Sequence, residues 1–296
     1  MFGTCPPESG EFTALFRCGN VASIAMTTAR SDSPAGWPVL HLFYRIDRAR
    51  WRSLEGSERG AAIAEIGQLL TRLDGEEGLQ FIPVAGVAKS DVGIMAVHPD
   101  FSRIQQLGQE ITATAFGACL IPVYSFLSIS EASEYISSDG DWARQLVDEQ
   151  GMDPTSPEFA ASIAGHKKRM DGYRESRLHP QLPADYPVLC FYPMRKSRTD
   201  GRNWYSLDFN ERKRYMAGHA TSGRRFADRV TQLITSATGL DDWEWGVTLF
   251  SRDVKSIRDI VYEMRFDPGS ALFGEFGPFF VGLRFGAEEA AAVLRL

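Results

Sequence analysis

A histidine on one stripe of a predicted helix is the first residue of this chain that could do chemistry. His219 shares the stripe with Tyr215, Ser222 and Phe226, a spacing that points its imidazole inward. The positions beside it hold small residues: Ala217, Gly218, Ala220 and Gly223. Glycine within a helix costs about 0.5–1 kcal/mol relative to alanine, so two glycines indicate that something wide lies against the backbone. The alternative is a core histidine with an ordinary hydrogen-bonding partner.

A lone imidazole favours a metal whose other ligands are not protein side chains. The remaining histidines lie on other predicted elements: His41, His98, His166 and His179. No HxxxH or ExxH pattern includes His219, so zinc is disfavoured, because it needs three or four protein ligands. Haem iron needs only one axial base, since the porphyrin supplies four nitrogens. A planar macrocycle also explains the small residues around His219.

The same stretch of chain is strongly basic. Residues 195–229 hold ten lysines and arginines against four acidic residues, a net charge of +6 in a chain whose total is −6. One interpretation is a solvated helix face, the usual role of a basic run. The other is a binding wall for a multiply anionic small molecule such as a porphyrin, whose propionates pair with lysine and arginine.

Composition excludes several other classes of protein. The 296 residues are 44% hydrophobic and 24% charged, which is ordinary for a globular chain. No apolar run reaches the roughly 18–20 residues that span a bilayer, so we expect no membrane span. The N-terminus lacks a basic region followed by an apolar one, so no secretory signal is expected, and Met26 is an alternative start. The overall acidity argues against nucleic acid as the main partner.

The cysteines indicate the compartment. Cys5, Cys18, Cys119 and Cys190 are scattered and form no CxxC pair. Such spacing is typical of a reducing environment and argues against a disulfide framework. We therefore expect a cytoplasmic location.

Hydrophobic periodicity predicts the same order of elements twice. In the first half the predicted strands are 39–46, 79–87, 92–97 and 120–129, and the predicted helices are 51–73 and 100–116. In the second half the strands are 188–192, 230–237, 243–250 and 279–285, and the helices are 207–225, with Ser206 as N-cap, and 253–266. The order is β-α-β-β-α-β, the ferredoxin-like arrangement.

The two halves also match in sequence. Two groups of residues recur 153 positions later: Trp51, Ser53, Leu54, Glu58 and Arg59, and then Gly93, Asp100 and Ile104. Phe43-Tyr44 recurs 148 positions later as Phe191-Tyr192. We interpret these matches as an internal duplication. The predicted fold class is α+β: two ferredoxin-like repeats whose four-stranded sheets pack face to face as a dimeric α+β barrel within one chain.

The duplication sets the expected domain boundaries. Residues 1–36 form an N-terminal extension that we expect to be poorly ordered, and 37–135 form the first repeat. Residues 136–185 form a linker with an added helix near 157–170, and 186–296 form the second repeat. A feature of both repeats is expected to be structural, whereas a feature of one repeat is a candidate for function. His219 meets the second condition, because its counterpart is Ile66.

Several blocks of the second repeat resemble the coproheme decarboxylases of the chlorite dismutase superfamily. They are, in order, Tyr192-Pro193-Met194-Arg195-Lys196, Asn203-Trp204-Tyr205, His219, Gln232, GLDDWEWG at 239–246 and EFGPF at 275–279. The resemblance covers about residues 37–296. It implies a cytoplasmic homopentamer that turns iron coproporphyrin III into haem b, with hydrogen peroxide as oxidant and loss of two CO2 from two propionates. It also implies transient contact with a ferrochelatase.

The resemblance implies roles for three residues at the reaction centre. His219 is the expected proximal ligand of the iron. Tyr192 is the expected catalytic tyrosine, whose phenoxyl radical takes hydrogen from the propionate β-carbon; a phenol suits this because it keeps its proton at neutral pH. Lys196 is expected to hold or protonate a reacting propionate. The alternatives are packing for Tyr192, because Tyr44 holds the matching place in the first repeat, and a solvated side chain for Lys196.

The remaining matches concern the surroundings of the porphyrin. Arg177 and Arg224 are expected to pair with propionates, as guanidinium groups do with carboxylates, and Ser270 to donate a hydrogen bond to one. Met194 is expected beside the ring, although core filling is the simpler explanation by composition. Gln232 stands where chlorite dismutases have a distal arginine. It could hydrogen-bond a peroxide on the iron, or be an ordinary sheet-facing glutamine.

The favoured function is therefore that of an oxidoreductase, coproheme decarboxylase. The alternative in another class is a haem-binding or haem-delivery protein without turnover, for which His219 and the arginines suffice. Tyr192 and Lys196 discriminate between the two, because simple binding needs neither. A chlorite dismutase-like peroxidase is disfavoured by Gln232, and a nucleic-acid binder by the inward face of the basic helix.

Overall fold

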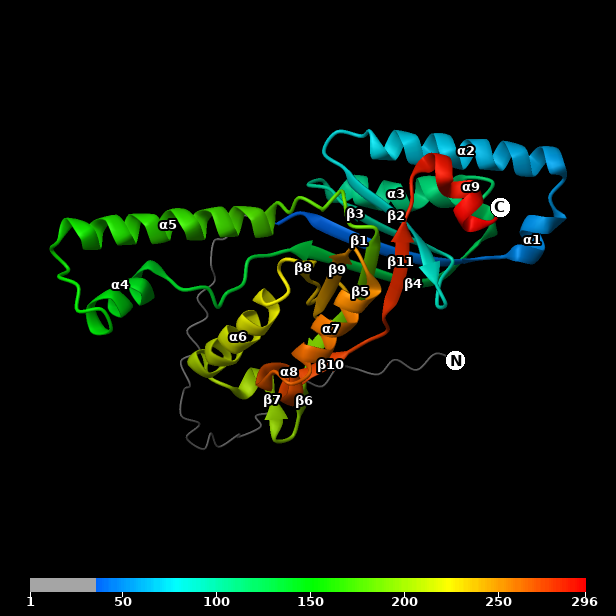
Figure 1. The fold of residues 1–296 in the computed structure, drawn as a ribbon. Coiled ribbons are helices and arrows are strands. Elements are labelled where there is room, and N and C mark those ends of the chain that lie inside the picture. Colours follow the sequence, from blue (N-terminus) through cyan, green and yellow to red (C-terminus); the bar gives the residue numbers. More distant parts are fainter. Residues whose placement is uncertain (1–35) are drawn as a thin grey trace, which may run out of the picture. The chain divides into compact units, whose positions relative to one another are not determined.

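The strands and helices of the first half follow the predicted order β-α-β-β-α-β, with the first helix divided in two (Figure 1). The computed structural model describes residues 36–296, so the predicted extension 1–36 lies outside the described residues except for Gly36. The strands of the first half are β1 (Pro38–Ile46), β2 (Gln80–Val87), β3 (Val92–Val97) and β4 (Leu120–Ser130). Its helices are α1 (Arg48–Ser53), α2 (Gly56–Asp74) and α3 (Phe101–Ala113), followed by the 3₁₀ turn Gly117–Cys119.

The second half repeats this order with additions. Its long strands are β5 (Val188–Lys196), β8 (Val230–Ser236), β9 (Trp245–Ser251) and β11 (Phe280–Arg284). Its main helices are α6 (Phe209–Arg224) and α7 (Val254–Met264). The additions are β6 (Arg198–Thr199), β7 (Arg202–Asn203), the 3₁₀ turn Trp204–Ser206, α8 (Pro268–Phe273), β10 (Gly274–Phe276), the 3₁₀ turn Ala287–Glu289 and α9 (Ala290–Leu294).

Two predicted helix starts are wrong. The helix expected over 51–73 is divided, because Glu55 forms a capping box with Glu58 and begins α2 there. Helix α6 begins after Asp208 and not after Ser206. The Asp208 carboxylate accepts the Glu211 amide hydrogen and the Glu211 carboxylate accepts that of Asp208. Two reciprocal hydrogen bonds satisfy more of the free amides at a helix start than one serine hydroxyl can.

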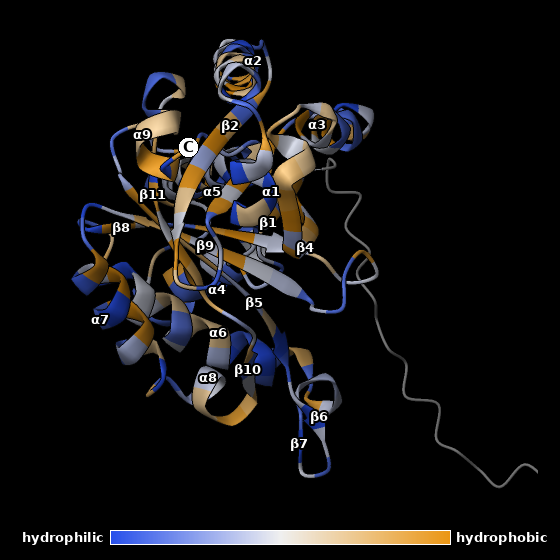
Figure 2. Cartoon of the chain, turned by 90° about the vertical axis from the view of Figure 1, so that its right-hand side faces the viewer, coloured by the Kyte–Doolittle hydropathy of each residue, from blue (hydrophilic) through white to orange (hydrophobic). Residues whose placement is uncertain are grey.

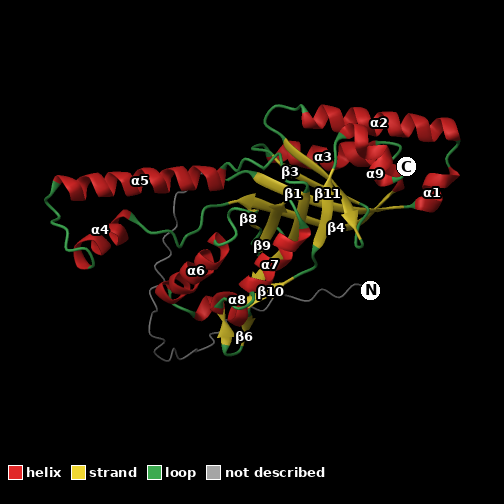
Figure 3. Ribbon diagram, viewed as in Figure 1, coloured by secondary structure: helices red, strands yellow, loops and turns green. Residues whose placement is uncertain are grey.

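The eight long strands form one closed antiparallel ring (Figures 1 and 3). Within each half their order is that of a ferredoxin-like sheet, β2-β3-β1-β4 and β11-β5-β9-β8. The ring closes where β2 pairs with β11 and β4 pairs with β8. This confirms the predicted α+β fold, in which two ferredoxin-like repeats make one barrel.

The ring has an inner and an outer face, because side chains alternate along a strand. On β5, Phe191 faces the interior and packs with Phe43 and Phe126, whereas Cys190 and Tyr192 face outward. Helices α2 and α3 cover the outer face of the first half, and α7 covers part of the second. Figure 2 shows hydrophobic residues along β4, and both hydrophobic and hydrophilic residues on helices such as α2 and α7. Within residues 36–296, no helix combines the length and apolar content that crossing a bilayer requires.

The linker between the halves contains two helices, where one was predicted. They are α4 (Asp139–Asp148) and α5 (Pro157–Leu178), and α5 is longer than the predicted helix 157–170. The linker also contacts α6. Lys213 Nζ lies 2.6 Å from the Asp141 carboxylate of α4. Just before the linker, the Tyr135 hydroxyl accepts a hydrogen bond from Arg212 at 3.2 Å. The inserted residues therefore pack against the helix that carries His219.

The strand register shows which residues of the two halves are equivalent. Tyr44 pairs with Val92 in the first half, and Met194 pairs with Trp245 in the second. Val92 and Trp245 are 153 positions apart, the spacing of the duplication. Tyr44 is therefore equivalent to Met194.

The same register corrects one predicted match. Counting back two residues makes Leu42 the counterpart of Tyr192, and counting forward two makes Ile46 the counterpart of Lys196. The match of Phe43-Tyr44 with Phe191-Tyr192 is therefore wrong. The residue types agree, but in the strand register Phe43-Tyr44 lie two positions beyond the residues that are equivalent to Phe191-Tyr192. Tyr192 is thus a feature of the second half only.

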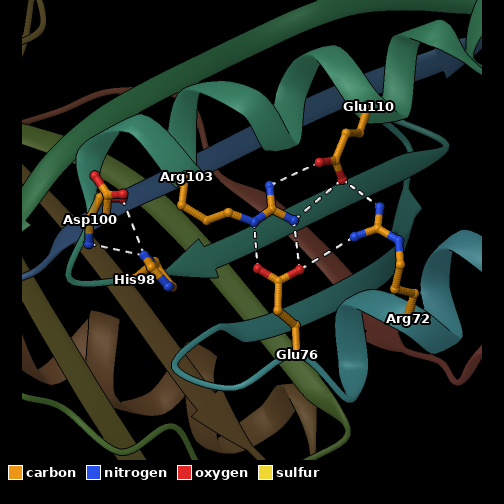
Figure 4. A network of polar contacts seen from close by, with 6 residues as sticks. All are labelled: Arg72, Glu76, His98, Asp100, Arg103 and Glu110. Atoms are coloured by element: carbon orange, nitrogen blue, oxygen red, sulfur yellow. Dashed lines mark hydrogen bonds and ion pairs between the residues drawn. The ribbon is translucent and has the colours of Figure 1, made fainter.

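An ion pair between two helices supports these equivalences. Arg72 of α2 contacts the Glu110 carboxylate of α3 at 2.6 Å, within a larger network of α2 and α3 (Figure 4). In the second half Arg225 contacts the Glu263 carboxylate at 2.9 Å. Both partners lie 153 positions after their counterparts. The pair is therefore a structural device that both halves retain.

Gly246 offers a test of the close packing inside the ring. A Cβ atom at this position would lie 2.5 Å from Cε1 of Phe126, a ring that is fully buried. We expect Gly246→Ala to lower the free energy of unfolding by about 1–3 kcal/mol, as overpacking does, measured by urea unfolding. The control is Gly60→Ala on exposed α2, where a Cβ meets nothing within 4 Å and stability should rise by about 0.5–1 kcal/mol. An unchanged Gly246→Ala variant would contradict this packing.

Candidate functional site

The outer face of β5 carries three of the predicted site residues. Tyr192, Met194 and Lys196 alternate with inward-facing residues, so all three lie on the same side of the sheet. On β9, Val247 pairs with Tyr192 and Trp245 with Met194. We call this outer face of β5, β8 and β9 the floor of the site. It lies in the half of the barrel that contains His219.

His219 projects from α6 toward α8. Its Nδ1 lies 3.0 Å from Oδ2 of Asp267 and 3.3 Å from the Ser270 hydroxyl. The Asp267 carboxylate is almost fully buried and also accepts the Ser270 amide hydrogen at 3.0 Å. Burial lowers the pKa of His219, and the bond to Asp267 opposes this shift. A neutral imidazole that donates from Nδ1 presents its Nε2 lone pair to a metal, so the residues fit an axial ligand of haem iron.

Sequence reasoning missed Asp267. The available signal was its position three residues before Ser270, the spacing of a helix N-cap. In the first half Thr114 occupies the equivalent place and accepts the Gly117 amide hydrogen at 2.8 Å. The second half keeps this turn, but the Asp267 carboxylate replaces the Thr114 hydroxyl and contacts His219. This contact depends on how α6 and α8 pack, so the sequence pattern alone did not reveal it.

Lys196 is buried at the end of β5, and only 6% of its surface is exposed. Its Nζ lies 3.4 Å from the Gly269 carbonyl oxygen and 4.4 Å from the centre of the Trp204 ring. Burial lowers the pKa of Lys196 to about 8, although the carboxylates of Asp267 and Glu244 oppose the shift. The alternative of a solvated lysine is therefore wrong. An ammonium buried without a directly bonded carboxylate is costly, which favours a functional role.

Tyr192 is buried among aromatic rings. It stacks on Phe279 with ring centroids 4.4 Å apart, and the Phe276 ring lies at 5.9 Å. Burial raises the pKa of Tyr192, so the phenol keeps its proton at neutral pH. Met194 is partly buried in the same cluster. Core packing explains Met194 as well as a place beside a ligand does.

Gln232 lies on β8 and shares the floor. Its counterpart in the register is Phe81, a core residue. A Cβ on Gly223 of α6 would lie 3.4 Å from Gln232 Nε2, so the amide points toward the helix that carries His219. Arg177, near the end of α5, donates a hydrogen bond to the Gln232 carbonyl oxygen at 3.1 Å.

The Arg177 guanidinium has further donors to offer. Its Nε is buried and has no hydrogen-bond partner among residues 36–296. A buried donor without an acceptor costs about 1–3 kcal/mol, and a carboxylate of a ligand would remove that cost. The position of Arg177 therefore suits a residue that binds an acidic group.

The structure does not bring Arg224 to the other predicted residues. It is exposed at the C-terminal end of α6, where it donates a hydrogen bond to the Thr221 hydroxyl at 3.0 Å. The basic segment 195–229 is also not one continuous wall, because five of its ten cations pair with carboxylates. These partners are Glu275, Glu244, Asp141, Glu263 and Asp228. Those five cations are therefore less available to an anionic ligand than the other five.

Two surface hollows lie away from these residues. One of about 640 Å³ lies between β4 and residues 240–243, and one of about 480 Å³ lies between β2 and residues 184–187. Neither is lined by a histidine or by any predicted site residue. The chemistry of the side chains, and not the size of a hollow, therefore locates the candidate site at His219.

Comparisons with known proteins show the family to which this chain is related. The chlorite dismutase family matches residues 59–285. A protein of Natronomonas pharaonis whose name describes heme binding is 35% identical over 262 residues, which are 87% of this chain but only 40% of that relative. The structure of a heme-binding protein from Thermus thermophilus is 35% identical, with a TM-score of 0.72 over 89% of this chain and 96% of that one. A chlorite dismutase variant from Candidatus Nitrospira defluvii shares the fold, with a TM-score of 0.65 at 16% identity over 89% and 95% of the two chains.

Replacing Asp267 by asparagine tests whether its carboxylate supports His219. Asparagine can still accept the Ser270 amide hydrogen, but it removes the negative charge beside Nδ1. We expect Asp267→Asn to weaken the binding of ferric haem by about 10–100-fold, the usual effect of losing such a partner. Absorption titration of the variant and the wild type measures this.

The matched control is Asp253→Asn. Asp253 is the N-cap of α7 and accepts the Ser256 amide hydrogen at 2.7 Å, but it makes no hydrogen bond to His219. Its haem affinity should stay within about twofold of the wild type, because capping acts on the helix alone. Equal weakening in both variants would show that helix capping, and not support of His219, is the role of Asp267.

Proposed function

Because this chain belongs to the chlorite dismutase family, we propose that it is a coproheme decarboxylase that converts iron coproporphyrin III to haem b. The observation that carries the proposal is the pair of buried residues on β5. Tyr192 and Lys196 share one face in the half that contains His219, whereas the first half has Leu42 and Ile46 at these places. Heme binding in the names of two relatives supports the class of ligand.

The reaction is an oxidation. Each propionate loses CO2, one proton and two electrons as its –CH2–CH2–COO⁻ chain becomes a vinyl group. One hydrogen peroxide takes up two electrons and two protons and becomes two waters. The bound iron porphyrin supplies the redox chemistry that couples the oxidation of the propionate to the reduction of hydrogen peroxide.

Tyr192 takes the hydrogen atom in this proposal. Its phenol is neutral, because burial raises its pKa, so its oxidation removes a proton together with an electron. The oxidised tyrosine then takes a hydrogen atom from the propionate β-carbon, which regenerates the phenol. The rings of Phe276 and Phe279 keep water from the oxygen-bearing ring, which limits side reactions of a radical.

Polar residues around the floor hold the propionates. Lys196 offers a buried ammonium, Arg177 its free Nε–H and Ser270 its hydroxyl. Arg224 is proposed as a propionate partner on the resemblance alone, because the fold leaves it exposed at the end of α6, and Met194 packs beside the ring. Charge-assisted bonds of this kind orient a carboxylate before it reacts.

Gln232 favours a decarboxylase over a chlorite dismutase-like peroxidase. Its amide carries no charge to hold an oxychlorine anion, but its N–H groups can donate to a peroxide. A haem-binding or haem-delivery protein without turnover is the second candidate, because two relatives are named for heme binding. That function leaves the burial of Tyr192 and Lys196 on one face without a purpose.

We further propose a cytoplasmic homopentamer that meets a ferrochelatase transiently. The pentamer and the ferrochelatase rest on the resemblance to coproheme decarboxylases. The compartment is supported by Cys119 and Cys190, which are buried free thiols.

Adding iron coproporphyrin III and titrating hydrogen peroxide tests the function directly. Mass spectrometry should show the loss of two CO2 per porphyrin in the wild type. Tyr192→Phe should bind the porphyrin normally and stop both decarboxylations, because phenylalanine has no phenolic hydrogen to give. Full turnover in this variant would disprove the role of Tyr192, and an unchanged porphyrin in the wild type would favour haem delivery.

Tyr44→Phe is the matched control. Tyr44 is buried on the outer face of the first half, and Met194 and not Tyr192 is its counterpart. The variant should convert coproheme at the wild-type rate. If Tyr44→Phe lost as much coproheme conversion as Tyr192→Phe, removal of a buried hydroxyl would act through the fold and not through the reaction.

The pKa of Lys196 predicts a pH dependence of porphyrin binding. The ammonium is charged below a pKa of about 8 and neutral above it, so its attraction for a propionate is lost as the pH rises through that value. The affinity for iron coproporphyrin III should therefore fall between about pH 7 and pH 9. Lys196→Met should remove this step, and an identical pH profile in the variant would contradict the pairing.

A further inference from the structure

The carboxylate of Glu244 holds the strand end that carries Lys196. Glu244 is only 4% exposed, and its Oε2 accepts the Lys196 amide hydrogen at 2.8 Å. Its Oε1 accepts a hydrogen bond from Arg198 at 2.7 Å. Its own amide donates to the Met194 carbonyl oxygen at 3.1 Å. The buried Glu244 side chain therefore makes hydrogen bonds to two segments: to Lys196 at the end of β5 and to Arg198 in the first strand of the hairpin β6–β7.

Arg198, whose guanidinium donates to Glu244, lies within the loop that follows β5. The Trp204 amide donates to the Ser197 carbonyl oxygen at 3.0 Å, which closes the loop. The closed loop places the Trp204 ring over the Lys196 ammonium, which also contacts the Gly269 carbonyl oxygen of α8. Glu244 thus supports the loop that fixes the direction of the Lys196 side chain.

The first half contains the same arrangement around Asp91. Asp91 lies 153 positions before Glu244. Its Oδ2 accepts the Ile46 amide hydrogen at 2.8 Å, and its amide donates to the Tyr44 carbonyl oxygen at 2.8 Å. Arg48, two residues after Ile46, approaches the same carboxylate at 3.8 Å, as Arg198 approaches Glu244.

The backbone on the neighbouring strand matches too. Gly86 donates its amide hydrogen to the Asp91 carbonyl oxygen at 2.9 Å, and Ala237 donates to that of Glu244 at 2.7 Å. These shared bonds define a carboxylate clamp, made by Asp91 in the first half and by Glu244 in the second. A device present in both halves is structural in origin.

What differs is the residue that the clamp holds. In the first half this is Ile46, which is buried in the hydrophobic core. In the second half it is Lys196, whose Nζ lies among polar and aromatic groups near α8. The acid also differs: the Asp91 side chain is 39% exposed, whereas that of Glu244 is 6% exposed. A buried carboxylate that accepts two hydrogen bonds holds its partners more rigidly than a half-exposed carboxylate, because water does not compete for the hydrogen bonds.

We propose that Glu244 is the positioning residue of Lys196: the clamp of the second half holds the end of β5 and the loop above it so that the ammonium keeps one direction toward the substrate. The proposal rests on the proposed function for the role of Lys196. Glu244 touches no substrate in it and acts only through the lysine.

The test compares Glu244→Gln with Asp91→Asn, which is the same change in the clamp of the first half. Hydrogen exchange of the peptide around residue 196, measured by mass spectrometry without porphyrin, should be faster in Glu244→Gln and unchanged in Asp91→Asn. With iron coproporphyrin III and hydrogen peroxide, Glu244→Gln should lower kcat by about 10–100-fold, the effect of a misplaced reactive group. The KM should rise no more than it does in Lys196→Met, because the iron ligand and the other propionate contacts remain.

Three results would overturn the proposal. Unchanged exchange near residue 196 in Glu244→Gln would show that the carboxylate does not hold the strand end. An equal loss of kcat in Asp91→Asn would show a general effect on the fold. Faster exchange with a normal kcat in Glu244→Gln would show that the clamp is structural only.

Failure of the proposed function remains distinguishable from failure of the clamp. If the wild type converts no coproheme, the proposed function is wrong, and the exchange measurement still decides whether Glu244 holds Lys196. If Glu244→Gln does not fold, Arg198→Gln removes one bond of the clamp at an exposed side chain. It should raise exchange near residue 196 and lower kcat by about threefold, in proportion to the smaller loss, and no change in either would overturn the proposal.

Discussion

Closure of the strands into one ring is the constraint on which the rest of this structure depends. Each half has a sheet with two faces, and its own helices cover only one of them. Pairing β2 with β11 and β4 with β8 buries the other face of both halves at once, around Phe126, Phe191 and Phe280. It also satisfies the backbone groups that would otherwise lie at open sheet edges. With the inner face filled by hydrophobic rings, any site must lie on the outer face, between strands and helices.

The two halves use the same backbone devices for different ends. The carboxylate clamp, the turn after the second helix and the ion pair between helices all recur, so both outer faces have the same framework. On that framework the first half places residues that pack: Leu42, Ile46, Ile66 and Phe81. The second half places polar residues there: Tyr192, Lys196, His219 and Gln232. A duplicated scaffold lets one half hold the barrel together while the other half carries polar groups.

Those polar groups are costly for the second half. Lys196 is buried without a directly bonded carboxylate, and Asp267 is buried to serve His219. Removing such charges from water opposes folding unless other contacts compensate. The compensation here is local, because each charge is held by backbone and side-chain bonds from neighbouring elements. Local violations of good packing, surrounded by regular structure, are the usual mark of a functional site.

Periodicity in the sequence determined the elements, their order and the duplication, because alternation and helical spacing are local properties. Residue type and the contrast with Ile66 were enough to single out His219, and the motif blocks identified the family. Only the tertiary structure decided the rest. Leu42, and not Tyr44, is the counterpart of Tyr192. The hydrogen bonds between strands set the register, and similarity of residue types does not. Asp267, Glu244 and four of the five carboxylates that pair with the basic segment come from distant positions, so their contacts exist only once the ring has closed and the helices have packed.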